Sequence, residues 1–366
     1  MGDVSVERPK VSIVLAVRDD EQSVGGCLQA IAGQAYPLDL AELIVAVAQS
    51  RDQTRKIVQR HARSIAFPVT IVDNPRGSAA SGFNAGLRRA SGDVIVLLGA
   101  RARPDSGFLA ANVAALERSG AEACGGVVNG QANSEQGEVL ALALGSSFGV
   151  GDASYRHSRR AGEVDTINYG AYRREVFAWL GGFDETMDNV EDDEFNYRLR
   201  ARGGRLFLTP EIRCGYLVRD TILAGIRQYV RYGFPKVRVL RRHPRQMRPR
   251  QFVPAVFVAA LLSGTVAAPW SRAARRMLWL TLGSYVAACL TVSARIAART
   301  RWHYLALLPV AFAGIHLGYG AASLAGAVRF LLWPALCGLP EPLDVPAVMT
   351  ALEPGDWDGC NGGAPV

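Results

Sequence analysis

Glu191, Asp192 and Asp193 are the first three of four consecutive acidic residues that open a charged stretch of the chain. We expect this stretch to form a helix from Val190 to Arg202, with the three carboxylates in its first turn. The dipole of a helix favours negative charge at the N-terminus and keeps such carboxylates ionised. An ionised carboxylate can act as a general base that removes the proton of an attacking hydroxyl group. The alternative is an acidic helix end that only faces solvent.

A second group of carboxylates follows two apolar runs near the start of the chain. Asp19 and Glu21 come directly after the run 11–17, and Asp52 follows the run 43–48. Short apolar runs rich in β-branched residues are typical of buried parallel strands. Ligands of parallel α/β sheets bind at the carboxyl ends of the strands. We therefore expect Asp19, Glu21 and Asp52 to lie at a ligand site.

Two further apolar runs and the segments between them complete the pattern. Strands are predicted at 11–17, 43–48, 69–72 and 94–98. Helices are predicted at 52–66, 78–90 and 105–118, and a further helix begins at residues 19–21 and ends near residue 34. This alternation predicts an α/β domain with a Rossmann-like, mostly parallel sheet. Beyond Gly120 the glycine-rich sequence predicts loops and short strands, with helices at 173–180 and 190–202.

The C-terminal third of the chain is strongly apolar. Long apolar segments cover 252–270, 277–294 and 303–326, and the mean hydropathy of the whole chain is +0.10. Each segment is close to the roughly 20 residues that a membrane-spanning helix needs. We expect about three transmembrane helices within 251–333. A buried helical core is the alternative interpretation.

The positive charge of the chain is concentrated before the first apolar segment. The formal net charge is +8, and six arginines stand immediately before residue 252: Arg238, Arg241, Arg242, Arg245, Arg248 and Arg250. Lys and Arg collect on the cytoplasmic flank of membrane helices, so this position favours a membrane over a nucleic acid as partner. The basic, amphipathic stretch 222–240 is typical of a helix that lies at the membrane surface.

These features predict four parts: a domain at 1–220, a basic interfacial segment at 221–250, a membrane region at 251–333 and an irregular acidic tail at 334–366. The six cysteines and five histidines do not cluster, which argues against a structural zinc site. The first ten residues lack the apolar stretch of a signal peptide. We expect a multi-pass protein of the inner or plasma membrane, with its N-terminal domain in the cytoplasm. Arginines at 272, 275 and 276 would then lie outside, so the topology stays open.

Several motifs resemble those of the family 2 glycosyltransferases, which have the GT-A fold. The resemblance covers about 11–232 and rests on 11–21, Ser50-Arg-Asp-Gln-Thr54, Asn74-Pro-Arg-Gly77, Asn84-Ala-Gly-Leu87 and Ala90-Ser-Gly-Asp93. The most specific stretches come later and in order, at 148–156, 170–177, 181–185 and 191–199. Together these four resemble the succinoglycan-biosynthesis branch, whose membrane-associated members extend a lipid-linked sugar.

The resemblance implies roles for individual residues. Asp192 would be the general base, with Glu191 supporting it and Asp193 beside the acceptor and the diphosphate. Asp19, Glu21 and Asp52 would shape the nucleotide site. Gln228-Tyr-Val-Arg-Tyr232 is similar to a Gln-x-x-Arg-Trp motif of related transferases. Gln228 and Arg231 would then position the acceptor or diphosphate, and Tyr232 would stack on a sugar; the alternative is an ordinary basic interfacial helix.

The sequence departs from the family pattern where a metal is usually held. These transferases carry an Asp-x-Asp or Asp-x-His after the fourth strand, and its oxygens suit Mg²⁺ or Mn²⁺. Here Gly99 and Arg101 occupy those two positions. We predict no metal ligands and expect Arg101 or Arg103 to neutralise the leaving diphosphate. The alternative is a domain that keeps the fold and has lost efficient catalysis.

The sequence thus predicts an inverting hexosyltransferase of exopolysaccharide biosynthesis. It would move a hexose from a nucleotide-diphosphate sugar, with UDP-glucose as the starting guess, to a lipid-linked or membrane-proximal glycan. The alternative is a non-catalytic, transferase-like membrane partner of a polysaccharide assembly. A transporter is disfavoured because the apolar segments carry few of the charges that mark a transport pathway.

Overall fold

The computed structural model describes residues 8–151 and 153–332. They form two compact units, which we describe separately. Among the described residues, the sheet unit holds 8–128 and 158–216, and the helical unit holds 129–151, 153–157 and 217–332. The predicted boundary at 220 lies close to residue 217, but the helical unit also contains 129–157. The predicted tail at 334–366 lies outside the described residues.

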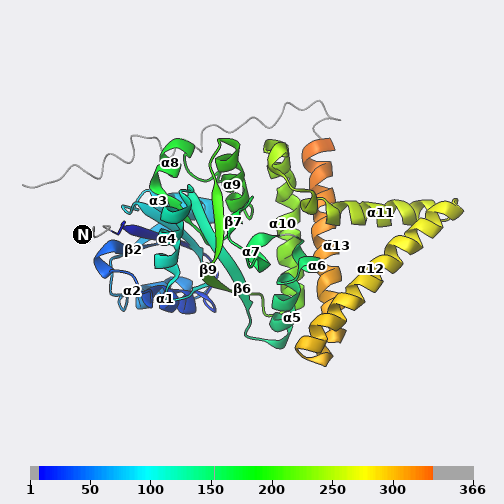
Figure 1. Ribbon diagram of the computed structural model, residues 1–366, viewed down its shortest axis with the longest axis horizontal. Helices are drawn as coiled ribbons and strands as arrows, with labels where there is room; N and C mark the ends of the chain where they lie inside the picture. Colours follow the sequence, from blue (N-terminus) through cyan, green and yellow to red (C-terminus); the bar gives the residue numbers. More distant parts are fainter. Residues whose placement is uncertain (1–7, 152, 333–366) are drawn as a thin grey trace, which may run out of the picture. The chain divides into compact units, whose positions relative to one another are not determined.

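One mixed sheet of nine strands organises the sheet unit (Figure 1). Its strand order is β3-β2-β1-β4-β8-β6-β9-β5, and β7 pairs with β9. The strands are β1 (Val11–Val17), β2 (Ala41–Ala48), β3 (Val69–Asn74), β4 (Val94–Gly99), β5 (Ala102–Pro104), β6 (Ala123–Gln131), β7 (Gly162–Glu163), β8 (Ala171–Arg173) and β9 (Leu206–Leu217). The four predicted strands are β1 to β4, and they are parallel to one another.

Helices cover both faces of the sheet. One face packs against α1 (Val24–Ala32), α2 (Thr54–Ala62) and α4 (Phe108–Ser119), and the other against α3 (Ala79–Leu87), α8 (Arg174–Leu180) and α9 (Glu191–Ala201). Successive strand residues alternate between these two cores: Ile13 and Leu15 lie in the first, and Val14 lies in the second. Because both faces are buried, these strands need continuous apolar sequence, which is why they were predictable.

The expectation of only short strands after Gly120 was wrong for β6 and β9, which have 9 and 12 residues. Glycines in β6 caused the error, because they usually weaken a strand prediction. A Cβ on Gly126 would lie 1.8 Å from the carbonyl oxygen of Ile212 on the neighbouring strand β9. Glycine is therefore required here by the close approach of two backbones rather than by a turn.

The strand order reverses between β1 and β4. From β1 the chain adds β2 and β3 on one side and then places β4 on the other side of β1. The register pairs Ala16 of β1 with Gly99 of β4, so both strands reach their carboxyl ends together. Such a reversal is the point at which open α/β sheets bind their ligands. Residues that directly follow Val17 and Gly99 are therefore placed at a predicted ligand site.

The helical unit consists of helices of very different lengths (Figure 1). They are α5 (Glu135–Leu144), α6 (Ser147–Val150), α7 (Ser154–His157), α10 (Ile222–Arg242), η2 (Pro244–Gln246), η3 (Pro249–Gln251), α11 (Val253–Ala267), α12 (Arg272–Arg299), η4 (Trp302–Ala306), α13 (Leu308–Ala327) and the π-helical turn η5 (Val328–Leu332). The predicted helix at 222–240 corresponds to α10. Helix α5 was not predicted.

Helices α10 and α13 run side by side over most of their length (Figure 1). Glycines allow the close approach. A Cβ on Gly233 would lie 2.4 Å from the carbonyl oxygen of Tyr319, and one on Gly326 would lie 2.5 Å from that of Phe234. These distances are too short for any larger residue. Small residues at such positions are typical of helix pairs whose backbones pack directly together.

Two stretches of the described chain are long and apolar enough to cross a membrane. They are α12 and the continuous helical stretch Trp302–Leu332, with mean hydropathies of 1.5 and 1.6. Large apolar side chains of α12 are exposed: Leu280 is 72% and Met277 68% accessible. The 15 residues of α11 fall short of the usual span of about 20. Two of the three predicted segments therefore have the length of a span, and the third remains a prediction.

Candidate active site

The loops after β1 and β2 interlock through hydrogen bonds between side chains and backbone. Asp19 Oδ1 accepts the N–H of Arg51 at 2.8 Å. The N–H of Glu21 donates to Asp52 Oδ2 at 3.0 Å, and Glu21 Oε2 accepts the N–H of Gln53 at 3.0 Å. The structure thus brings together the three carboxylates that the sequence suggested for the nucleotide site.

Asp52 is the most strongly bonded carboxylate of these loops. Burial opposes its ionisation, but its Oδ1 accepts the hydroxyl of Thr54 at 2.6 Å and the Thr54 N–H at 2.9 Å. Together with the N–H of Glu21, these donors outweigh burial and hold the pKa of Asp52 below its usual range. Asp19 has a φ of 48°, in the left-handed region. Hydrogen bonds therefore fix both the shape and the charge of this part of the site.

The two arginines after β4 have different surroundings. Arg101 is largely buried, and its Nε lies 3.9 Å from Oδ1 of Asp20, so the pair joins the ends of β4 and β1. The Arg103 guanidinium donates to backbone carbonyls instead, at 2.9 Å to Ser23 and 2.8 Å to Ala102. Arg101 therefore lies at the reversal of the strand order, whereas Arg103 would have to leave its carbonyl partners to reach a phosphate.

The acidic turn of α9 contains a buried carboxyl group. Glu191 is only 9% exposed, and its Oε2 accepts no hydrogen bond from any residue that the structure describes. Burial, followed by the charges of Asp192, Asp188 and Asp193, raises the pKa of Glu191 to about 8. Glu191 therefore retains its proton near neutral pH. A strongly shifted carboxyl group of this kind is typical of a functional site.

The two neighbours of Glu191 are half-buried and better supplied with donors. Asp192 Oδ1 accepts the N–H of Asp193 at 2.8 Å, and Asp193 Oδ1 accepts the Thr166 hydroxyl at 3.1 Å. The Thr166 hydroxyl in turn accepts Nδ2 of Asn196 at 3.0 Å. This network fixes the first turn of α9, and it presents Asp192 beside a protonated Glu191.

Asn84 supports the segment that leads into α9. Its Oδ1 accepts the N–H of Phe183 at 2.8 Å, and its Nδ2 donates to the carbonyl oxygen of Phe183 at 2.9 Å and to Glu185 Oε1 at 3.0 Å. Arg76 donates to the same Glu185 carboxylate at 2.7 Å. The sequence contained both motifs, at 84–87 and 181–185. It could not show that they contact each other.

Three of the predicted acceptor residues, Gln228, Arg231 and Tyr232, lie together on α10 of the helical unit, whereas Asp193 lies on α9 of the sheet unit. Nε2 of Gln228 donates to the Tyr232 hydroxyl at 2.6 Å, one helical turn away. Arg231 is exposed between them. The structure thus confirms a single helix for the motif 228–232, and the roles of its residues stay predictions.

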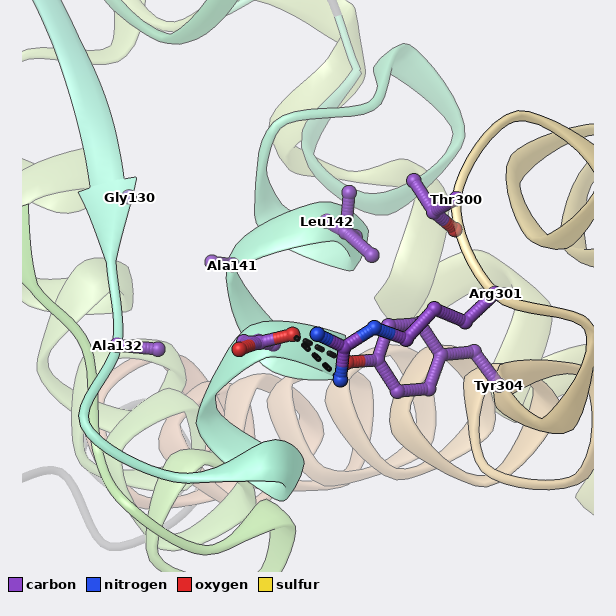
Figure 2. Close-up of a pocket in the computed structure, with 8 residues that line it drawn as sticks. Gly130, Ala132, Ala141, Leu142, Thr300, Arg301 and Tyr304 are labelled. Atoms are coloured by element: carbon purple, nitrogen blue, oxygen red, sulfur yellow. Dashed lines mark hydrogen bonds and ion pairs between the residues drawn. The ribbon is translucent and has the colours of Figure 1, made fainter.

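A cavity of about 310 Å³ lies elsewhere in the helical unit, between α5 and the α12–η4 junction (Figure 2). Figure 2 shows the side chains of Arg301 and Tyr304, which both come from this junction. The Tyr304 hydroxyl donates to Glu138 Oε2, and Arg301 Nη1 lies 3.7 Å from the same oxygen. Its polar side chains are therefore paired with one another, and none of the predicted site residues lines it.

The residues after β4 do not fit the divalent cation that the fold family implies. Gly99 offers no oxygen ligand from a side chain, and Arg101 would repel a cation. Within residues 8–151 and 153–332, no three His, Cys, Asp or Glu side chains come together as metal ligands would. The absence of the Asp-x-Asp motif is therefore not compensated by acidic residues from another described part of the chain.

A parallel α/β half with its ligand edge at β1 and β4, followed by antiparallel strands and an acidic helix, defines a glycosyltransferase of the GT-A fold. Residues 12–177 match the family model described as glycosyl transferase family 2. The chain therefore carries a family 2 glycosyltransferase domain, and it is an enzyme of glycan biosynthesis that acts on nucleotide sugars.

Curated relatives agree with this assignment. A succinoglycan biosynthesis protein, ExoA of Rhizobium meliloti, is 24% identical over 316 residues, which are 84% of this chain and 92% of ExoA. A dolichyl N-acetyl-α-D-glucosaminyl phosphate 3-β-D-2,3-diacetamido-2,3-dideoxy-β-D-glucuronosyltransferase of Methanococcus voltae is 25% identical over 239 residues, 63% of this chain and 74% of that protein.

Solved structures show the same fold. The mannosyltransferase PcManGT from Pyrobaculum calidifontis, solved with GDP-Man and Mn²⁺, matches 90% of this chain and 88% of its own, with a TM-score of 0.56 and 24% identity. TarS 1-349 from S. aureus, solved with UDP-GlcNAc, matches with a TM-score of 0.51 and 16% identity over 87% of this chain and 91% of its own.

Proposed function

We propose that the chain is an inverting hexosyltransferase that extends a lipid-linked glycan in the biosynthesis of an exopolysaccharide. The observation that carries this proposal is the acid pair at the start of α9. Glu191 is buried and its pKa is raised, whereas Asp192 next to it is half-buried at the N-terminus of the helix. A carboxyl group whose surroundings raise its pKa, next to a second carboxyl group, is typical of acid–base sites.

The reaction follows from these positions. Asp192 removes the proton of the acceptor hydroxyl while its oxygen forms a bond to C1 of the donor sugar. The bond from C1 to the diphosphate breaks on the opposite face, so the configuration at C1 inverts and the nucleoside diphosphate leaves. Glu191 adds no second negative charge while it is protonated, and Asp193 holds the turn in place.

The remaining site residues have binding roles in this proposal. Asp19, Glu21 and Asp52 shape the nucleotide site through the interlocked loops. Arg101 neutralises the diphosphate, with Arg103 contributing positive charge at the same strand end. Gln228 and Arg231 hold the acceptor or its phosphate, and Tyr232 stacks on a sugar.

The substrates are proposed from the relatives. The name of the Methanococcus voltae protein specifies a dolichyl-phosphate sugar, and that of the Rhizobium meliloti protein specifies succinoglycan. A lipid-linked acceptor also agrees with the two helices of membrane-spanning length. UDP-glucose is the first donor to test. We place the protein in the inner or plasma membrane as a multi-pass protein, with the sheet unit in the cytoplasm.

The test is release of nucleoside diphosphate by membranes that contain the protein, given a panel of nucleotide sugars and lipid-linked acceptors. We expect the wild type and an Asp39→Asn variant to release it and an Asp192→Asn variant to lose this activity. Asp39 is an exposed carboxylate of the same unit, so it controls for the substitution itself. Equal activity of Asp192→Asn and wild type would contradict the assigned base.

A second candidate is a non-catalytic, transferase-like partner of a polysaccharide assembly. The observation that favours it is the lack of acidic ligands after β4. Binding of a nucleotide sugar without release of product from any donor would support this alternative.

A further inference from the structure

The carboxyl end of β4 lacks an Asp-x-Asp motif, but it has two other side chains with hydrogen-bond donors, those of Arg101 and Tyr169. The mannosyltransferase of similar fold was solved with both GDP-Man and Mn²⁺. In the present chain Gly99 and Arg101 stand at the end of β4, and no three His, Cys, Asp or Glu side chains of the described residues come together as metal ligands would. The positive charge that a leaving diphosphate requires must therefore come from another source.

Arg101 is in the right place to supply this charge. It follows β4 by two residues, and Asp20 follows β1 by three, so their ion pair spans the reversal of the strand order. The side chains are only 16% and 19% exposed. A partly buried guanidinium interacts more strongly with an anion than an exposed one does, because water screens it less. Its planar fork also matches two phosphate oxygens at once.

Tyr169 is the second group at this strand end. It directly precedes Gly170, whose carbonyl oxygen accepts the N–H of Leu97 in β4 at 3.1 Å. A Cβ on Gly99 would lie 3.6 Å from the Tyr169 hydroxyl. The phenol therefore lies in van der Waals contact with the place where a side chain at position 99 would begin.

The backbone of Tyr169 is strained. Its φ is 53°, a region that non-glycine residues seldom occupy. Such strain persists where the surrounding structure imposes it, and it is characteristic of binding and catalytic sites. The hydroxyl of this strained residue lies beside Gly99 at the ligand edge of the sheet.

We propose that the chain binds the donor diphosphate without a divalent cation, through the guanidinium of Arg101 and the hydroxyl of Tyr169. Arg101 offsets the negative charge that develops when the bond to C1 breaks, and Tyr169 donates one hydrogen bond to a phosphate oxygen. Asp20 positions Arg101. This inference rests on the proposed transferase function, and it adds Tyr169 to the site.

The experiment measures equilibrium binding of UDP, GDP and dTDP to the full chain in lipid nanodiscs, first in excess EDTA and then in excess Mn²⁺. We expect the Kd of the preferred nucleotide to change by less than about twofold between the two conditions, since charge neutralisation comes from the protein. Loss of binding in EDTA that Mn²⁺ restores would overturn the proposal.

Variants test the two side chains. Arg101→Ala is expected to weaken binding roughly 10- to 100-fold, the usual effect of losing hydrogen bonds to a charged group. Tyr169→Phe is expected to weaken it by about 3- to 10-fold, and Arg101→Lys to fall between wild type and Arg101→Ala. Arg118→Ala removes an exposed ion pair with Glu211 and is the matched control. Unchanged binding by a folded Arg101→Ala variant would also overturn the proposal.

Binding needs neither an acceptor nor Asp192, so this proposal and the transferase function can fail separately. Nucleotide binding in EDTA without transfer from any donor would support the diphosphate site and reject the proposed function. Transfer that requires Mn²⁺ would support the function and reject metal-free binding. Absence of nucleotide binding under both conditions would reject both.

Discussion

Two groups of carboxylates in the sheet unit differ in their burial and in the hydrogen-bond donors around them. In the loops after β1 and β2, the carboxylates of Asp19, Glu21 and Asp52 accept backbone N–H groups, and the pKa of Asp52 lies below its usual range. At the start of α9, Glu191 is buried with an unbonded oxygen and a pKa of about 8. The surroundings of Asp52 therefore favour its charged form, and those of Glu191 favour its protonated form.

The comparison shows that hydrogen-bond donors have a strong influence on the pKa of a carboxyl group, beyond the number of acidic residues nearby. Thr54 gives Asp52 two donors within the same turn. Glu191 lies among other carboxylates, which raise its pKa further. We expect the loop carboxylates to control binding of the donor, whereas the α9 carboxylates control the chemical step.

The largest expected effect separates these two roles by kinetics. Asp192→Asn removes the proposed base and should lower kcat by about 10²- to 10⁴-fold, the usual contribution of general-base catalysis. Asp19→Asn should instead raise the KM for the donor, because it weakens the loop that shapes the nucleotide site. Steady-state kinetics of both variants would check this. A fall in kcat of equal size in the two variants would remove the distinction.

The second effect concerns the support of α9. Asn84→Ala leaves the N–H of Phe183 without its partner in a buried site, which typically costs about 1–3 kcal/mol. We expect a lower midpoint of chemical denaturation and a loss of activity at temperatures where the wild type is stable. Asn84→Asp, which keeps the Oδ1 acceptor, is the comparison variant. Unchanged stability of Asn84→Ala would show that the tie between α3 and the 181–185 segment is unimportant.

The third effect is a pH dependence of stability. The pKa of Glu191 is raised in the folded protein, so the unfolded chain releases this proton at lower pH than the folded chain does. The stability that protonated Glu191 provides is full below about pH 4.5 and is lost as the pH rises to about 8. Glu191→Gln cannot ionise, so its stability should decline less than that of the wild type across this range. Thermal midpoints at several pH values would measure the difference, and parallel curves would contradict it.

The smallest expected effect is a change in the free energy of unfolding when a loop carboxylate is replaced. Asp52→Asn replaces a charged acceptor with a neutral one and should cost about 0.5–1.5 kcal/mol near neutral pH. Because the pKa of Asp52 is lowered by folding, its contribution is present above its unfolded pKa and disappears as the pH falls through the folded value. The variant and the wild type should therefore converge in acid. Denaturation at neutral and at acid pH would test this, and a constant gap would argue against it.

The sequence predicted the parts of the fold that have a repeating pattern. Strands β1 to β4 and helix α9 were found because apolar runs and acidic helix starts are local signals. Strands β6 and β9 were missed, because Gly126 is fixed by contact with Ile212, which is far away in the sequence. The same limit applies to the site. The order of residues along the chain does not show that Glu191 is more buried than Asp192 and Asp193, or that the Tyr169 hydroxyl lies beside Gly99.

The glycine contacts between α10 and α13 have a mechanical consequence. Gly233 and Gly326 each receive a carbonyl group of the opposite helix, one contact on each side of the interface. These two contacts prevent α10 and α13 from sliding along each other. An axial displacement of one residue, about 1.5 Å, would bring a side chain into contact with the backbone of the opposite helix. The motif residue Arg231 is therefore locked in register with the apolar surface of α13. If α13 inserts into a lipid bilayer, its depth also sets the depth of the Arg231 guanidinium.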